Sequence, residues 1–225
     1  PETDMGTHRL LARAAPQDPA VEGLRAVHMS LIQRARSIEA QVILVTAPSY
    51  GAGKSFVASN LAALMAESGK RVLLIEADMR HPAVYRYVGL DPHASGLSDV
   101  LCGARSLDEV IYPHTSANMD TLMQGTMTDN PGSLLLLPEL SATLQTLRER
   151  YDHIVIHTPP LGAVGDALAF APVADCALLV VRPEQSLLDD ANDAVRRLER
   201  AGVRLEGVIF NGVRPSSRHS GFAPM

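Results

Sequence analysis

The sequence predicts an α/β protein whose doubly wound, mostly parallel sheet carries helices on both faces. Apolar runs typical of strands alternate with helical segments along most of the chain, the order that produces parallel strands joined by crossover helices. Several of these runs are continuous in Val, Ile and Leu, as in strands buried on both faces. A glycine-rich loop joins the first strand to the next helix, at the sheet edge where folds of this class bind ligands.

The composition agrees with one large α/β domain and excludes several functions. Of the 225 residues, 46% are hydrophobic and 4% are aromatic, with no Trp, which suits an aliphatic parallel sheet better than a sandwich. The formal net charge of −5 argues against a nucleic-acid-binding surface, so we expect no nucleic-acid partner. Cys102 and Cys176 lack the paired spacing of a metal or iron–sulfur site.

The N-terminal region is expected to be a linker followed by a helix. Residues 1–17 are predicted to be a flexible linker, and a helix is predicted over 18–38, where Asp18 can cap the first turn and Pro19 fits it. No apolar run reaches the roughly 20 residues of a membrane helix. Because the chain begins with Pro1 rather than Met, we expect a domain excised from a longer protein, with a membrane segment allowed upstream.

The other elements are predicted within a domain over 18–213, followed by a flexible tail at 214–225. Strands are expected where apolar runs are bounded by turn residues, at 41–46, 71–78, 119–125, 154–157, 174–183 and 204–212. Helices are expected over 54–69, 138–151 and 187–202, with shorter helical segments at 95–103 and 107–112.

The clearest motif is APSYGAGKS at 47–55, between a predicted strand and a predicted helix. This is the context of a P-loop, in which backbone N–H groups and a helix N-terminus surround phosphates, Lys54 reaches the β- and γ-phosphates and Ser55 binds Mg²⁺. The pattern G-x-x-x-x-G-K-[ST] is kept except at its first position, which is Pro48. An ordinary glycine-rich turn is the alternative. We expect phosphate contacts from Gly51, Ala52, Gly53, Lys54 and Ser55.

The second motif is VLLIEADMR at 72–80, a hydrophobic strand that delivers Glu76 and Asp78 near its carboxyl end. Residues two positions apart on a strand share one face. Paired acids beside a P-loop can hold Mg²⁺ or its waters, and one can accept a proton from an attacking hydroxyl. A helix cap or a solvated turn is the alternative for such acids in isolation.

The third motif is YDHIVIHTPP at 151–160, a strand that ends in His157. In many P-loop ATPases the strand at this position ends in an aspartate that binds a magnesium-bound water. Neutral imidazole is a poor Mg²⁺ ligand because the ion prefers oxygen. His157 is therefore a structural residue, a modified phosphate or metal contact, or the mark of a decayed Mg²⁺ site.

Taken in order, these motifs resemble the bacterial tyrosine kinases, the cytoplasmic kinase domains or partners of polysaccharide co-polymerases. The resemblance runs from Val21 to Asn211 in the family's order. It includes the loop PSYGAGKSF, the acidic motif Glu76-x-Asp78-x-Arg80, and the later segments GLSDVLCG, NPGSLL, YDHIVIHTPP, GDALAFAPVADCALLVVRP and GVIFN.

The resemblance implies a fold of the P-loop NTPase type, with ATP and Mg²⁺ as cofactors. Asp78 would be the base that deprotonates the acceptor tyrosine. The implied catalytic residues are Lys54, Asp78, Glu76 and Arg80, and the implied metal ligands are Ser55, Asp78 and Glu76. The implied nucleotide contacts are those of the P-loop together with Phe56 and Asn211.

The chain departs from the family at two acidic positions and at its C-terminal end. Glu76 replaces an Asp, and His157 stands at the Walker B Asp, which makes that motif degenerate. No tyrosine follows Tyr151, so a tyrosine-rich tail that would be autophosphorylated is absent from this chain.

The resemblance also implies partners. Glu22 and Arg25 match a Glu-x-x-Arg-x-x-Arg helix by which such kinases assemble into rings, although His28 stands at the last arginine. A solvated helix face is the alternative. The implied partners are ATP or ADP, further copies of the chain, and a membrane co-polymerase segment or transmembrane activator at the cytoplasmic face of the inner membrane.

Three functions follow from these observations. The first is an ATP-dependent protein-tyrosine kinase that autophosphorylates and regulates capsule or exopolysaccharide polymerisation and export. The second is an impaired pseudokinase that binds nucleotide and acts as an assembly module. The third is a positioning ATPase of the deviant Walker class, whose signature lysine is missing from Ala47-Pro48-Ser49. We favour the kinase.

Overall fold

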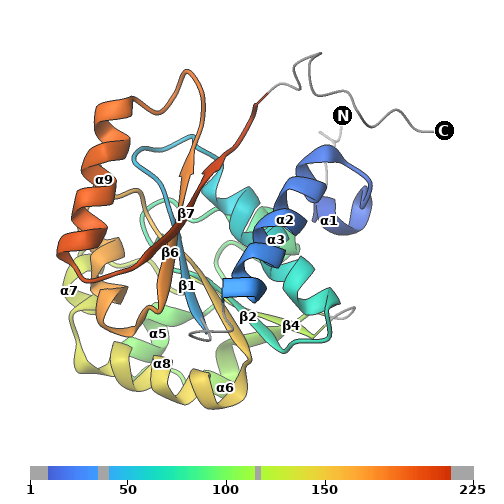
Figure 1. The fold of residues 1–225 in the computed structure, drawn as a ribbon. Helices are drawn as coiled ribbons and strands as arrows, with labels where there is room; N and C mark the ends of the chain where they lie inside the picture. Colours follow the sequence, from blue (N-terminus) through green and yellow to red (C-terminus); the bar gives the residue numbers. More distant parts are fainter. Residues whose placement is uncertain (1–9, 35–40, 115–117, 214–225) are drawn as a thin grey trace, which may run out of the picture.

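A mostly parallel sheet forms the centre of the computed structural model, which describes residues 10–34, 41–114 and 118–213 (Figure 1). Within these residues the sheet has seven strands in the order β3-β4-β2-β5-β1-β6-β7. All neighbours pair in parallel except β3 and β4, which are antiparallel. The strands are β1 (Val42–Thr46), β2 (Val72–Glu76), β3 (Ile111–Pro113), β4 (Met119–Leu122), β5 (His153–His157), β6 (Cys176–Val181) and β7 (Leu205–Phe210). The predicted doubly wound α/β fold is confirmed.

Helices cover both faces of this sheet. One face carries α1 (Leu11–Ala14), α2 (Pro19–Arg34), α3 (Lys54–Glu67) and α4 (Tyr85–Val88). The other face carries α5 (Leu97–Leu101), α6 (Leu107–Val110), α7 (Pro131–Leu135), α8 (Pro138–Arg150), the 3₁₀ helix η1 (Asp166–Val173) and α9 (Leu188–Arg200). Among the described residues, no helix is both long and apolar enough to cross a bilayer.

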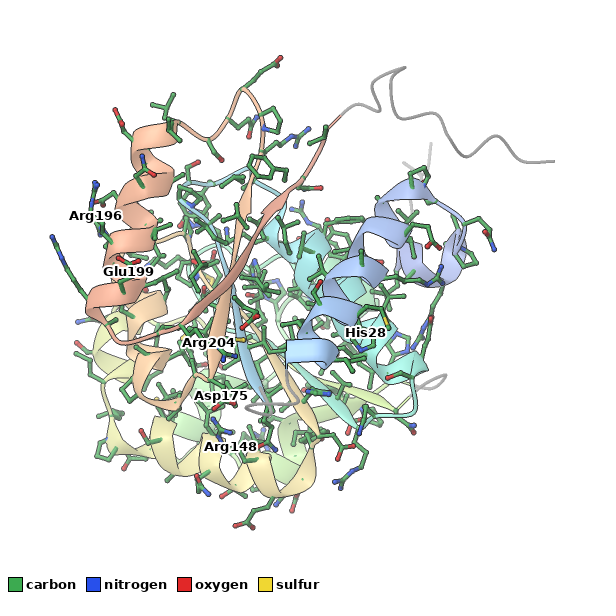
Figure 2. The ribbon with its side chains drawn as sticks, in the orientation of Figure 1. His28, Arg148, Asp175, Arg196, Glu199 and Arg204 are labelled. Carbon is green, nitrogen blue, oxygen red and sulfur yellow. The ribbon has the colours of Figure 1, made fainter. Side chains whose placement is uncertain are left out.

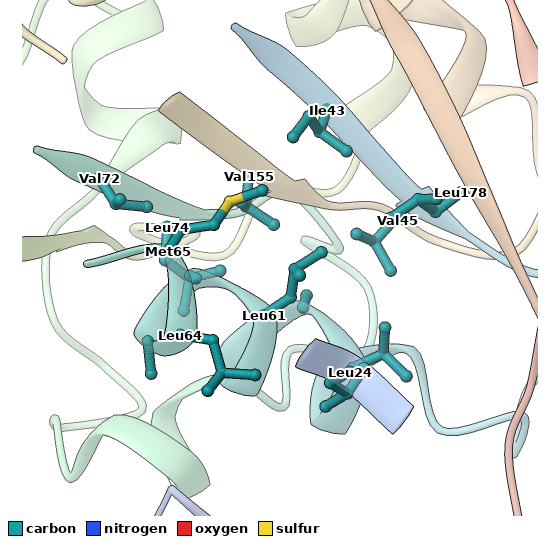
Figure 3. Close-up of a cluster of buried hydrophobic side chains, with 14 of the residues drawn as sticks. Leu24, Ile43, Val45, Leu61, Leu64, Met65, Val72, Leu74, Val155 and Leu178 are labelled. Carbon is teal, nitrogen blue, oxygen red and sulfur yellow. The ribbon is translucent and has the colours of Figure 1, made fainter. Parts of the chain in front are cut away.

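Successive strand residues supply two separate hydrophobic cores. In β1, Ile43 and Val45 point into the core under α3, while Val42 and Leu44 point into the core on the opposite face. Figure 3 shows the first core, where strand side chains meet Leu61 and other residues of α3. Because neighbouring residues on a strand face opposite sides, a strand buried on both faces needs apolar residues throughout. This explains the continuous apolar runs in the sequence.

The helix α3 lies between the sheet and the N-terminal helices, because α1 and α2 both contact it. Its residues 57–66 are buried on every side. Four of them are alanines, and their small side chains allow a helix to approach both a sheet and other helices closely: Ala58, Ala62, Ala63 and Ala66. The helix that follows the P-loop is therefore fixed in position from two directions.

The structure corrects the expected linker at residues 1–17. Residues 10–14 are ordered against α3: Leu10 is 3% exposed, and the backbone N–H of Ala12 donates to Asn60 Oδ1 at 2.9 Å. The apolar Leu10 and the small Ala12 fill space above α3, which composition alone did not indicate. The predicted cap is confirmed, since Asp18 Oδ1 accepts a hydrogen bond from Ala20 N–H at 2.8 Å. Residues 1–9, 35–38 and 214–225 lie outside the described residues.

Three further elements differ from the expectation. The strand predicted at 71–78 ends at Glu76, so Asp78 lies in the loop that follows. The segment predicted as a helix at 107–112 is helical to Val110 and then pairs with β4 as an antiparallel strand. The segment 166–173 is a 3₁₀ helix that periodicity did not reveal, because Pro172 interrupts its pattern.

A polar network closes the amino end of the sheet, opposite the P-loop. Asp175 accepts hydrogen bonds from the backbone N–H groups of Gln41 and Val42 at 2.9 and 2.7 Å, and Arg148 donates to the same carboxylate at 2.8 Å. Figure 2 labels Arg148 and Asp175 near the start of β1. These bonds fix the start of β1, and the P-loop follows the opposite, carboxyl end of the same strand.

Candidate nucleotide-binding site

The P-loop lies at the carboxyl end of β1, and two of its glycines have backbone conformations that other residues rarely adopt. Gly51 has φ +82° and Gly53 has φ +91°, both in the left-handed region. A Cβ on Gly53 would lie 2.0 Å from Asn211 Nδ2, and a Cβ on Gly51 would lie 2.2 Å from Gln185 Oε1. Backbone conformation therefore favours glycine at both positions, and the half-buried Asn211 amide also restricts the space at Gly53, whereas the exposed end of Gln185 can move away from Gly51.

Neighbouring segments hold this loop from outside. Asn211, just after β7, donates from Nδ2 to the carbonyl of Ala52 at 2.9 Å. Ser49 donates from Oγ to the carbonyl of Gln185 at 3.4 Å. Asn211 thus lies beside the P-loop, and the nucleotide contact expected of it stays a prediction. The Phe56 side chain instead packs toward α4, edge-to-face with Tyr87 at 6.4 Å between centroids, so a nucleotide contact by Phe56 stays a prediction.

Lys54 is the first residue of α3 and is only 6% exposed. Burial lowers the pKa of its ammonium group, and the nearby charges of Asp78 and Glu76 act in the opposite direction. The ring centroid of Tyr50 lies 5.3 Å from its Nζ, within the range of a cation–π contact. A buried cation at the start of a helix provides a site for phosphate oxygens.

Asp78 lies beside Lys54 in the loop after β2 and is 1% exposed. Among the described residues it accepts one hydrogen bond, at Oδ1 from the backbone N–H of His81 at 2.9 Å. Burial raises the pKa of the Asp78 carboxyl group and the charge of Glu76 raises it further, while the His81 bond lowers it. A carboxylate whose pKa is raised toward neutrality is a better proton acceptor, as a general base requires.

Glu76 has a different environment, because both of its oxygens are already engaged. Oε1 accepts a hydrogen bond from Asp78 N–H at 2.9 Å and lies 2.6 Å from His157 Nδ1. Oε2 accepts from the backbone N–H groups of Ala83 and Val84 at 2.8 and 2.9 Å. A carboxylate has about four acceptor sites. Glu76 therefore lies at the site, but contacts with other protein groups already use its acceptor positions.

His157 connects Glu76 to the P-loop. Its Nδ1 faces Glu76, and its Nε2 lies 3.1 Å from Ser55 Oγ. The register between β2 and β5 places Glu76 directly beside His157, and both are the last residues of their strands. The side chains predicted separately from three motifs thus form one hydrogen-bonded chain.

Arg80 forms an ion pair with Asp166, an acid that the sequence motifs did not single out. Its Nε donates to Asp166 Oδ2 at 2.8 Å, and its Nη2 to Asp166 Oδ1 at 3.5 Å. Asp166 begins η1 and is 9% exposed. Its place in GDALAF was visible in the sequence, but no local pattern indicated its partner. The catalytic role expected for Arg80 stays a prediction.

The residues present fit a nucleotide with Mg²⁺ better than a free metal ion. Among the described residues, no group of three or more His, Cys, Asp or Glu side chains could hold a metal by itself. Mg²⁺ usually takes one or two protein oxygens and completes its shell with water and phosphate oxygens. Ser55 and Asp78 can supply such oxygens, and Lys54 and the glycine-rich loop suit the phosphates.

Comparisons with known proteins identify the family of the chain. A family model described as an AAA domain matches residues 40–202. The tyrosine-protein kinase etk of Escherichia coli strain K12 is 34% identical over 212 residues, which cover 93% of this chain and 29% of that protein. The chain thus spans less than a third of the length of the curated relatives it matches.

Solved structures give the same result over nearly the whole chain. The BceF tyrosine kinase domain has a TM-score of 0.84 and 38% identity, over 92% of this chain and 84% of that one. The kinase domain of Escherichia coli tyrosine kinase ETK has a TM-score of 0.87 and 33% identity, over 95% and 84%. A septum site-determining protein MinD from Pyrococcus horikoshii, complexed with Mg-ADP, is less similar, with a TM-score of 0.67 and 28% identity over 79% and 72%. The chain therefore belongs to the bacterial tyrosine kinases, in which it corresponds to the P-loop kinase domain.

Proposed function

We propose that this domain binds ATP with Mg²⁺ and transfers the γ-phosphoryl group to tyrosine. The observation that carries the proposal is the position of Lys54 and Asp78, a buried cation and a buried carboxylate that act on each other's pKa at the mouth of the P-loop. Kinase relatives at 33–38% identity support this activity over a positioning ATPase.

Each residue has a definite task in the proposed reaction. The P-loop backbone and Lys54 would bind and orient the phosphates, and Ser55 and Asp78 would hold Mg²⁺ directly or through water, which supplies charge neutralisation during transfer. Asp78 would also accept the proton of the acceptor hydroxyl. Arg80, paired with Asp166, would hold the loop that carries Asp78. Asn211 would hold the P-loop beside the nucleotide.

The acceptor is proposed to be a tyrosine outside this chain. No tyrosine follows Tyr151 in the sequence, so the tyrosine cluster that the family resemblance implies would lie outside these 225 residues. We further propose that the domain works at the cytoplasmic face of the inner membrane, as a domain or partner of a membrane co-polymerase in capsule or exopolysaccharide synthesis.

The test is phosphotyrosine formation on a tyrosine-rich peptide, with nucleotide affinity measured on the same preparations. Lys54→Met is expected to abolish transfer and weaken ATP binding. The chain has one other lysine, Lys70, which is exposed beyond α3, so Lys70→Met is a matched control that should keep full activity. Unchanged transfer in Lys54→Met would contradict the proposal.

The pseudokinase is the second candidate, and two observations favour it. His157 stands where an acidic Mg²⁺-side residue was expected, and the acceptors of Glu76 are occupied. Under this alternative the parent chain binds ATP but forms no phosphotyrosine. The peptide assay therefore separates the two candidates directly.

A further inference from the structure

The chain of side chains from Ser55 to Glu76 has more than a packing role. Ser55 Oγ lies 3.1 Å from His157 Nε2, and His157 Nδ1 lies 2.6 Å from Glu76 Oε1. Glu76 and His157 are 0% and 1% exposed, so water does not compete for the bond between them, while Ser55 is half-buried. A buried polar chain of this kind has defined donors and acceptors.

The donors around Glu76 determine where the imidazole carries its proton. Three backbone N–H groups, those of Asp78, Ala83 and Val84, donate to the two Glu76 oxygens. With these donors in place, Glu76 acts as an acceptor on both oxygens. An ionised carboxylate has only acceptors, so beside an ionised Glu76 the fourth contact is made by a proton on His157 Nδ1.

The protonation state of Nε2 follows from that of Nδ1. In a neutral imidazole with a proton on Nδ1, Nε2 is an acceptor. Its neighbour is the Ser55 hydroxyl, which is then the donor of the 3.1 Å bond. The hydroxyl proton is thereby turned toward His157, and the oxygen lone pairs of Ser55 stay available for a metal ion. The single Nε2 lone pair is engaged, so His157 itself has none left for Mg²⁺.

We propose that His157 and Glu76 act together as a positioning pair that replaces the acidic Walker B residue. Glu76 fixes the ring, the ring orients the Ser55 hydroxyl, and Ser55 and Asp78 provide the protein oxygens for the metal. Glu76 is then a positioning residue and not a metal ligand, unlike the expectation from the sequence. This inference rests on the proposed binding of nucleotide with Mg²⁺.

The first experiment tests the ring state without any ligand. In protein labelled with ¹⁵N-histidine, two-bond ¹H–¹⁵N correlation spectra distinguish protonated from unprotonated ring nitrogens. We expect protonated Nδ1 and unprotonated Nε2 for His157 at neutral pH. In Glu76→Gln the amide oxygen keeps the backbone donors of Ala83 and Val84, so its NH₂ group faces the ring and the proton should move to Nε2. A proton on Nε2 in the parent chain would overturn the proposal whether or not any variant folds.

The second experiment measures ADP affinity with Mg²⁺ and with EDTA in the parent, Glu76→Gln, His157→Leu and the double variant. Each single variant should weaken Mg²⁺-dependent binding by about 10- to 100-fold, the usual cost of losing a residue that orients a metal ligand. The double variant should lose no more than either single variant, because both remove the same orientation of Ser55. His157→Gln, which keeps an acceptor near Ser55, should retain most of the affinity. His153→Leu, at the other end of β5, is the matched control and should bind as the parent does.

The outcomes separate this inference from the proposed function. If the parent chain binds ADP with no dependence on Mg²⁺, the proposed function fails first. A second outcome is Mg²⁺-dependent binding in the parent, together with affinity losses of the two single variants that add in the double variant. Glu76 and His157 would then act independently, and the proposed positioning pair would be wrong. Unchanged Mg²⁺-dependent affinity in Glu76→Gln would also overturn it.

Discussion

At the scale of single residues, the site is defined by which polar groups are already engaged. Glu76 has four donors, and Arg80 is held by Asp166, so two of the four side chains expected in catalysis are bound to other protein groups. Lys54 and Asp78 are left as the residues whose charges face the P-loop. Residue type and spacing identified all four, but only the structure shows their bonds.

The Arg80–Asp166 ion pair should contribute measurably to stability. Asp166→Ala is expected to lower the free energy of unfolding by about 1.5 kcal/mol, the lower end of the range for hydrogen bonds to charged groups, because it removes the bond of Arg80 to a carboxylate that is 9% exposed. The exposed pair of Asp193 and Arg197 on α9 is a control, for which Asp193→Ala should cost clearly less. Urea unfolding measures both. Equal losses would show that the Arg80 pair contributes no more than a surface pair.

His28 should make stability depend on pH. It lies on α2 (Figure 2), is 7% exposed, and its Nε2 has no hydrogen-bond partner among the described residues. Burial lowers its pKa below the ordinary 6.5, and the neighbouring His153 lowers it further. The unfolded chain therefore binds this proton more readily, and stability should fall as the pH drops below about 6.5.

The variant His28→Leu isolates this effect. It should unfold with a weaker pH dependence between about pH 7 and 5 than the parent, while the exposed His93→Leu should not change the dependence. Thermal unfolding across this range is the measurement. An identical pH dependence in His28→Leu and the parent would contradict the assigned pKa shift.

At the scale of elements, the P-loop depends on the end of β7 as well as on its own glycines. Gly53 and Gly69 both have positive φ, +91° and +86°, but a Cβ on Gly69 would meet nothing within 4 Å. Gly69→Ala is thus expected to cost about 1 kcal/mol, from backbone conformation alone. Gly53→Ala should cost clearly more, since its Cβ would also meet Asn211.

The contribution of Asn211 can be separated by a double variant. Asn211→Ser shortens the side chain that the new Cβ would meet, so Gly53→Ala should be less destabilising in the Asn211→Ser background than in the parent. Chemical denaturation of the four proteins is sufficient. Additive losses would show that Asn211 does not restrict the loop.

The long elements of the fold could be predicted from the sequence, and the short ones could not. Strands buried on both faces, and the helix after the P-loop, were predictable because their apolar patterns are long. Short elements were not: residues 10–14, β3 and η1 are ordered by contacts with distant segments. The same holds in the site, where the P-loop and the acids were visible as motifs. The Glu76–His157 and Arg80–Asp166 bonds join residues 81 and 86 positions apart, which no local pattern reports.

At the scale of the whole molecule, assembly into a ring is a proposal centred on α2. Glu22 and Arg25 form an ion pair on its surface, and Met29 and Ile32 expose 52% and 43% of their area there. We expect Met29→Ser with Ile32→Ser to shift the chain toward monomer in light scattering at high concentration. Met127→Ser, at another exposed apolar residue, should leave the mass distribution unchanged. A parent chain that stays monomeric at all concentrations would contradict self-association by this domain alone.

The most direct measurement follows the γ-phosphoryl group of ATP labelled with ³²P, in the presence of Mg²⁺ and a tyrosine-rich peptide. We expect label on tyrosine, formed only with Mg²⁺ and lost in Asp78→Asn. Label released solely as inorganic phosphate would indicate an ATPase. Label that stays on tightly bound ATP would indicate a pseudokinase, and either result would contradict the assignment of tyrosine kinase activity to this chain.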